Sequence, residues 1–159
     1  MRLLRHPAFH WALAMLLGAI FVYASLDKIA HPDDFARIVY HYRILGPSQT
    51  FGPLPANLLA VTLPWVEVVA GLLLLSGVWR REAAAVAAIL LVAFLGAVAF
   101  ALTHGIDIEN CGCFTVTGTG RRAGVQLLLG DVAMLAAALI LTTVEPRASG
   151  PLTTAEEPA

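Results

Sequence analysis

Charged residues are scarce in this sequence. Only 13% of its 159 residues are Asp, Glu, Lys or Arg, whereas an ordinary soluble domain has about 25%. The net charge is -1, so the chain lacks the basic surface that nucleic-acid-binding proteins use, and we expect no nucleic-acid partner. Hydrophobic residues make up 58% of the chain, and the mean hydropathy is +0.77. This composition excludes an ordinary soluble globule and, at this length, favours a single membrane domain.

Cysteine is almost absent as well. The chain has two cysteines, both in the tripeptide Cys111-Gly112-Cys113. Small secreted proteins that are held together by several disulfides have cysteines spread along the chain, so that class of protein is excluded. The five histidines do not cluster. We therefore predict no resident metal from the histidines, and the chemistry of the cysteines must be local.

Four long apolar runs dominate what remains. They cover about residues 9–26, 57–79, 83–103 and 123–144, and inside them only Glu67 and Asp131 carry charge. A helix needs about 20 apolar residues to cross the hydrocarbon core of a bilayer. The sequence therefore predicts an all-α fold, a four-transmembrane-helix bundle of residues 1–144 embedded in the lipid bilayer. The tail 145–159 is rich in Pro, Ala, Thr and Glu, a composition typical of disorder.

The first apolar run also has features of a secretory signal. Arg2 and Arg5 precede it, and residues 22–24 resemble a signal-peptidase site. The run is long for a signal, and Trp11 and Tyr23 have the spacing of interfacial anchors. We expect a retained first helix, with a cleaved signal as the alternative.

The segment between the first two runs is long and mixed. Its apolar residues recur at three- and four-residue spacing, which predicts a short amphipathic helix lying at the membrane surface; they are Phe35, Ile38, Val39 and Tyr42. By contrast, only Arg80, Arg81 and Glu82 separate the second and third runs. Those two spans must form an antiparallel hairpin.

The sequence decides the orientation of the chain in the membrane less clearly than it decides the number of apolar runs. With both termini inside, five basic residues face the cytoplasm and five face outside; these are Arg2, Arg5, Arg80, Arg81 and Arg147 against Lys28, Arg37, Arg43, Arg121 and Arg122. A double arginine in a three-residue turn is hard to translocate. We favour this orientation in the inner (plasma) membrane, with the cysteine loop on the outer face, where disulfides persist.

The Cys-Gly-Cys tripeptide can support redox chemistry. A disulfide needs Cα atoms about 4.4–6.8 Å apart, which residues two apart reach only with a bent backbone that Gly112 permits. So small a ring should be strained and should exchange readily with thiols. Other interpretations stay open: a two-thiolate site for a soft metal such as Cu(I), a persulfide or thiosulfonate carrier, or two buried small side chains.

Ionisable groups in the spans form the second candidate site. Glu67 falls in the middle of the second run, where an unpaired carboxylate costs about 2.5–3.5 kcal/mol. Lys28 and Asp131 are candidate partners, and Trp65 is a candidate cofactor contact. Glu67 is interpreted as a proton relay or a quinone-facing group, or as a structural interhelical hydrogen bond. Glycines in the runs, Gly18 and Gly71 among them, predict close helix packing.

Several segments resemble the MauE/DoxX membrane protein family. Residues 21–29, with Asp27-Lys28, resemble the end of that family's first helix, and residues 64–67, Pro-Trp-Val-Glu, with Gly71 and residues 77–81 resemble its second helix. Residues 111–114, Cys-Gly-Cys-Phe, resemble the signature of the MauE branch. The resemblance covers about residues 10–143.

The resemblance implies a four-helix membrane bundle with a redox role. MauE-type proteins are associated with methylamine utilisation, where they assist maturation of a disulfide-rich subunit beside a thioredoxin-like partner, and DoxX relatives are tied to quinone. By position, Cys111 and Cys113 become the redox pair, with weaker roles for Glu67 and Lys28. We therefore predict an envelope thiol–disulfide redox protein with a thioredoxin-fold or client partner and quinone as a candidate cofactor. A non-catalytic assembly factor and a copper-binding protein are the alternatives.

Overall fold

Helices account for the regular structure of the part of the chain that the computed structural model describes, residues 6–42, 44, 54–106 and 125–144. There are five within these ranges, and no strand: α1 (Pro7–Ala30), α2 (Pro32–His41), α3 (Leu54–Ser76), α4 (Arg80–Thr103) and α5 (Val125–Thr143). The all-α prediction is confirmed. The tail 145–159 and both cysteines lie outside the described residues.

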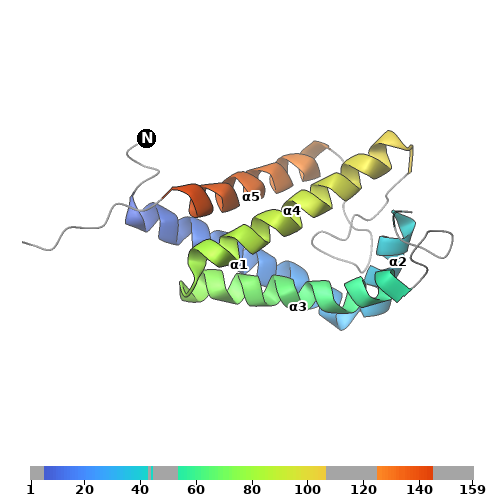
Figure 1. Cartoon of the computed structure of the whole chain (residues 1–159), viewed down its shortest axis with the longest axis horizontal. Coiled ribbons are helices and arrows are strands. Elements are labelled where there is room, and N and C mark those ends of the chain that lie inside the picture. The colour runs from blue at the N-terminus through green and yellow to red at the C-terminus, as the bar shows by residue number, and fades with distance from the viewer. Residues whose placement is uncertain (1–5, 43, 45–53, 107–124, 145–159) are drawn as a thin grey trace, which may run out of the picture.

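The four longer helices lie side by side as a bundle, with α2 at one end (Figure 1). The most extensive contacts are between α1 and α3 and between α4 and α5. Three helices are long and apolar enough to cross a membrane, Pro7–Ala30, Ala56–Ser76 and Arg80–Thr103, and Leu128–Thr143 is a shorter apolar helix. The chain is thus a multi-pass membrane protein, since several such spans cannot be buried by 159 residues alone.

Two helix ends differ from the expected spans in ways that matter for the site. Helix α1 continues to Ala30 instead of ending near residue 26, which places Lys28 inside the helix. Helix α3 ends at Ser76 because Gly77 adopts φ +74°, a left-handed conformation that glycine tolerates. Trp79, at φ 47°, then starts α4. The resulting turn produces the antiparallel hairpin that the short linker predicted.

Helices α1 and α3 approach through glycine. A Cβ atom built on Gly18 would lie 2.7 Å from the carbonyl oxygen of Gly71, and one built on Gly71 would lie 2.9 Å from that of Gly18. Side chains at either position would force the backbones apart, so small residues are what allow this crossing. The close approach fixes the faces of α1 and α3 that meet further along, where the polar residues lie.

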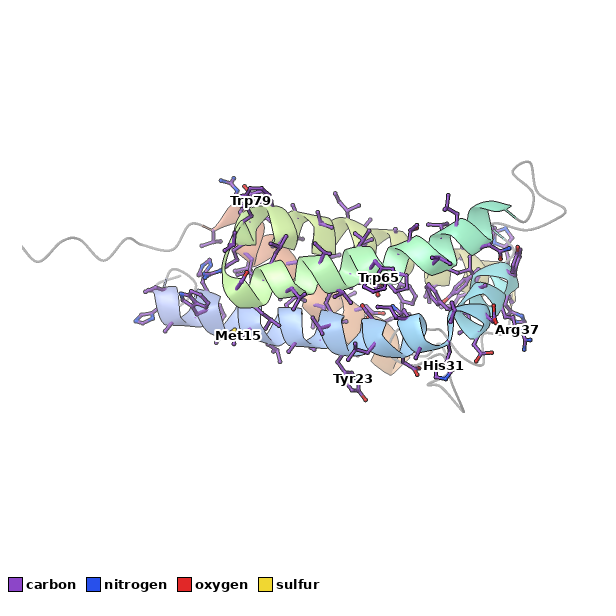
Figure 2. All side chains as sticks on the ribbon, turned by 90° about the horizontal axis from the view of Figure 1, so that it is seen from below. Met15, Tyr23, His31, Arg37, Trp65 and Trp79 are labelled. Atoms are coloured by element: carbon purple, nitrogen blue, oxygen red, sulfur yellow. The ribbon has the colours of Figure 1, made fainter. Side chains whose placement is uncertain are left out.

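Helix α2 exists as predicted, and its apolar face is packed on protein. Phe35 is buried and forms a cluster with Ala60 of α3, joined by Val39 and Leu63. Tyr42, directly after the helix, packs with Val98 and Ala101 of α4. Arg37 lies on the outside, 83% exposed, at the same end of the molecule as His31 (Figure 2). Trp79 lies at the opposite end (Figure 2).

Candidate functional site: a buried polar cluster

A buried ion pair joins the first and third helices. Lys28 Nζ lies 2.8 Å from Glu67 Oε2 and 3.0 Å from Glu67 Oε1, so the ammonium group donates to both carboxylate oxygens. The two side chains are only 5% and 14% exposed. Lys28 is the only lysine in the sequence. In apolar surroundings each charge is tolerated because the other compensates it.

Two neighbours hold this pair in place. Ser25, one turn before Lys28 on α1, is fully buried, and its hydroxyl can donate either to Phe21 O at 2.7 Å or to Glu67 Oε2 at 2.9 Å. A hydroxyl has one hydrogen, so these two bonds alternate. On the other side, the ring of Phe35 from α2 lies 5.3 Å from Lys28 Nζ, within the range of a cation–π contact.

A second carboxyl lies beside the pair without sharing its hydrogen bonds. Asp131 of α5 is 1% exposed, and its Oδ2 atom has no hydrogen-bond partner among the described residues. It lines a cavity of about 50 Å³ together with Lys28 and Glu67. The other walls are apolar and come from Ile20, Phe21, Ala24, Leu90, Leu91, Phe94 and Met134. Four helices therefore enclose one cation and two carboxyl groups.

Tyr42 adds a titratable group from the end of the bundle. Its side chain is 6% exposed. Burial raises the pKa of Tyr42 far above its usual range, and the negative charge of Asp131 raises it further. The phenol is thus close enough to Asp131 to respond to its charge, and it is held in its neutral form.

The residues predicted from sequence fall into three groups. Lys28, Glu67 and Asp131 come together at the cavity. Trp65 does not line the cavity; it is 57% exposed on the outer surface of α3. Cys111 and Cys113 lie outside the described residues. Within the ranges that the structure does describe, no three His, Cys, Asp or Glu side chains gather as a metal site.

Ser25 and Tyr42 belong to the cluster and were missed as site residues. From sequence, Ser25 stands only within the residues of the family resemblance, and Tyr42 only within the apolar face of the predicted short helix. The signal for Ser25 was available: it lies seven residues after Gly18 and three before Lys28, hence on the α1 face that meets α3. Nothing local in the sequence places Tyr42 beside α5.

The fold and the cluster together define a class: a multi-pass α-helical membrane protein with a buried Lys–Glu–Asp cluster between its helices. The chain belongs to the family of methylamine utilisation protein MauE, whose family pattern it matches over residues 6–144. That match covers every described residue, including the whole cluster.

Individual relatives agree with this assignment. The chain is 32% identical to the methylamine utilization protein MauE of Paracoccus denitrificans over 142 residues, which is 89% of this chain and 73% of that protein. It is 28% identical to the MauE proteins of Methylophilus methylotrophus and Paracoccus versutus, covering 86% and 92% of this chain and 69% and 75% of those proteins. No solved structure matches the chain.

Proposed function

We propose that this protein is a thiol–disulfide redox protein of the cell envelope that supports protein maturation in methylamine utilisation. The observation that carries the proposal is the cysteine content: a membrane protein of the MauE family has two cysteines, both in one tripeptide. The relatives' name links them to methylamine utilisation. The cysteine pair supplies chemistry that such a membrane protein could contribute.

The proposed step is an exchange between two cysteine pairs. A thiolate of the reduced Cys111/Cys113 pair attacks a disulfide in a thioredoxin-fold or client protein, and a mixed disulfide forms as the partner's sulfur–sulfur bond breaks. The second cysteine then attacks the mixed disulfide. The partner leaves with two thiols, having gained two electrons and two protons, and residues 111 and 113 are left joined. The reverse reaction reduces this pair at the partner's expense.

The described residues on either side of the cysteine-containing part of the chain support an exchange near one membrane face. Ile106, before it, and Leu128, after it, both pack around Tyr42, Val98 and Ala101. Both therefore lie at the end of the bundle where α2 lies. We propose that α5 is the fourth span, that α2 lies at the interface, and that this end faces outside.

The proposed step needs no quinone, and it makes no use of the cavity of about 50 Å³ between Lys28, Glu67 and Asp131. The exchange between cysteine pairs is balanced without a quinone. The quinone implied by the family resemblance stays a prediction from sequence.

Thiol trapping on intact cells tests the proposal. A membrane-impermeant alkylating reagent is applied before and after reduction, and the mass added to the protein is measured. Labelling of both cysteines only after reduction is expected. In a background with Cys111→Ser and Cys113→Ser, single cysteines at Arg37→Cys and Glu82→Cys report the two ends of the bundle, because both positions are exposed.

Each other outcome contradicts a defined part of the proposal. Labelling without reduction means free thiols, as in a reduced carrier or metal site, and copper bound in proportion to the cysteines then identifies a soft-metal protein. Labelling only in lysed cells, with Glu82→Cys accessible from outside, reverses the orientation. Methylamine growth that survives replacement of both cysteines by serine would identify an assembly factor that needs no thiol chemistry.

A further inference from the structure

Asp131 has a buried carboxyl oxygen without a hydrogen-bond partner in the part of the chain that the structure describes. Its carboxyl is 1% exposed, and Oδ2 has no protein partner there. Leaving a buried acceptor unsatisfied costs about 1–3 kcal/mol, and more when the group is charged. A carboxyl in this position therefore needs a proton, a water molecule or both.

Glu67 does not share this need. Both of its carboxylate oxygens accept from Lys28, and Oε2 can also accept from Ser25. The positive charge of Lys28 is thereby balanced by Glu67. Asp131 is a second negative charge beside a neutralised pair, in surroundings that are otherwise apolar. One proton on Asp131 makes the whole cluster neutral, which a low-dielectric site favours.

The cavity has room for the water that such a proton needs. A water molecule requires about 10–15 Å³, so a cavity of ≈ 50 Å³ can hold a few. Asp131, Glu67 and Lys28 supply polar partners around it. Lys28 has three N–H donors, and among the described residues its ammonium group hydrogen-bonds only to Glu67. A further donor and an unsatisfied acceptor thus face the same small space.

Among the described residues, the titratable and charged groups around Asp131 come from three elements. They are Lys28 from α1, Glu67 from α3 and Tyr42 from the end of α2. Helix α4 contributes only the apolar side chains of Leu90, Leu91 and Phe94 to the cavity. Tyr42 packs with Ile106, the residue that ends the described part of the chain after α4.

We propose that the cavity binds water between Asp131 and the Lys28–Glu67 pair, and that Asp131 takes up and releases a proton there. The step is the ionisation of the carboxyl: the O–H bond at Oδ2 breaks, the proton passes to cavity water and on to the solvent, and Asp131 becomes a carboxylate. Glu67 acts as the fixed counter-ion of Lys28. This assigns proton exchange to the aspartate and does not rest on the cysteine chemistry.

Infrared spectroscopy of the full chain in lipid nanodiscs tests the proposal. A protonated carboxyl has a C=O stretch separate from that of carboxylates, and this band shifts in D2O if the proton exchanges. We expect such a band to disappear as pH is raised, to shift when aspartate carries 13C in its side-chain carboxyl, and to be absent from Asp131→Asn. Glu82→Gln, an exposed carboxyl at the opposite end, should keep the band.

The water is tested in the same samples. Buried water with weak hydrogen bonds gives an O–H stretch that shifts when H2(18)O replaces H2O, and the pH-dependent difference spectrum should contain this band. Asp131→Leu, which removes the polar group, should lose it. The 13C labelling needs no substitution, so the assignment of the band to an aspartate survives if the Asp131 variants do not fold.

Three results would overturn the proposal. A protonated-carboxyl band that shifts with labelled glutamate instead of aspartate assigns the proton to a glutamate and not to Asp131. A band that does not shift in D2O means that the carboxyl proton does not exchange with the solvent, and that it has only a structural role. No protonated-carboxyl band at any pH means that Asp131 is always ionised and is held by another partner. None of these results depends on the state of Cys111 and Cys113, so the proposed redox function fails or stands separately.

Discussion

Lys28 Nζ bridges both oxygens of Glu67, at 3.0 and 2.8 Å, and so joins α1 to α3 across the interior of the bundle. Removing one partner leaves the other charge uncompensated, which costs about 3–5 kcal/mol for a buried pair. We predict that Lys28→Met and Glu67→Met each destabilise the protein by about this amount. The measurement is SDS-induced unfolding in mixed micelles.

The double variant distinguishes pairing from packing. With both charges removed, the apolar side chains fill similar volume, and the loss should be much smaller than the sum of the two single losses. Asp131 then loses the cation that lines the cavity with it, so we do not expect a full return to wild-type stability. Additive losses would contradict a direct interaction between Lys28 and Glu67.

Because Lys28 is the only lysine, its accessibility can be measured chemically. The side chain is 5% exposed and ion-paired, so an amine-reactive reagent should modify it slowly in the folded protein and quickly after unfolding. The matched control is Arg37→Lys, which places an amine where the side chain is 83% exposed. Peptide mass spectrometry gives both rates in one protein, and equal rates would show that Lys28 is open to solvent.

The raised pKa of Tyr42 predicts that the folded protein loses stability at alkaline pH. Burial raises the pKa of Tyr42, while in the unfolded chain a tyrosine ionises near pH 10. Its contribution is therefore complete below about pH 10 and is lost as the pH rises further, because only the unfolded chain releases the proton. Tyr42→Phe should remove this part of the alkaline decline in unfolding free energy, whereas Tyr23→Phe, 66% exposed, should not.

Tyrosinate absorbance gives an independent measurement. Wild type should show a tyrosine that ionises at higher pH than a tyrosine of the unfolded chain, and Tyr42→Phe should lack this ionisation. Since the charge of Asp131 is the second cause of the raised pKa of Tyr42, Asp131→Asn should move that ionisation to lower pH. An unchanged titration in Asp131→Asn would mean that the two groups do not interact.

The helices were predictable because a long apolar run is a local property of the sequence. The gathering of Lys28, Glu67 and Asp131 was predictable for a similar reason: ionisable groups in or beside spans seek one another. The rotation of each helix about its own axis, which decides which side chains point inward, was harder to predict from the sequence. Successive residues turn by about 100°, so Trp65 and Glu67, two residues apart, point to nearly opposite sides, and the structure places Trp65 outside. Tyr42 meets Asp131 only through the tertiary arrangement of α2 and α5.

The close contact of α1 and α3 at Gly18 can be tested by comparing its replacement with that of a glycine that has no neighbour at its Cβ position. A methyl group at Gly18 would lie 2.7 Å from the backbone oxygen of Gly71, which cannot move unless the helices separate. Overpacking of this kind costs about 1–3 kcal/mol, more than the gain of about 1 kcal/mol when alanine replaces glycine in a helix. Gly18→Ala should therefore destabilise the protein in SDS unfolding.

Gly96 of α4 is the matched control, because a Cβ atom there meets nothing within 4 Å. Gly96→Ala should be neutral or stabilising by up to about 1 kcal/mol, since only the helix propensity changes. Separation of α1 from α3 should also loosen the ion pair further along the same interface, so amine modification of Lys28 should become faster in Gly18→Ala and stay unchanged in Gly96→Ala. Equal stability and equal Lys28 reactivity in the two variants would mean that α1 and α3 do not meet at Gly18, and the polar cluster would then need another explanation for its position.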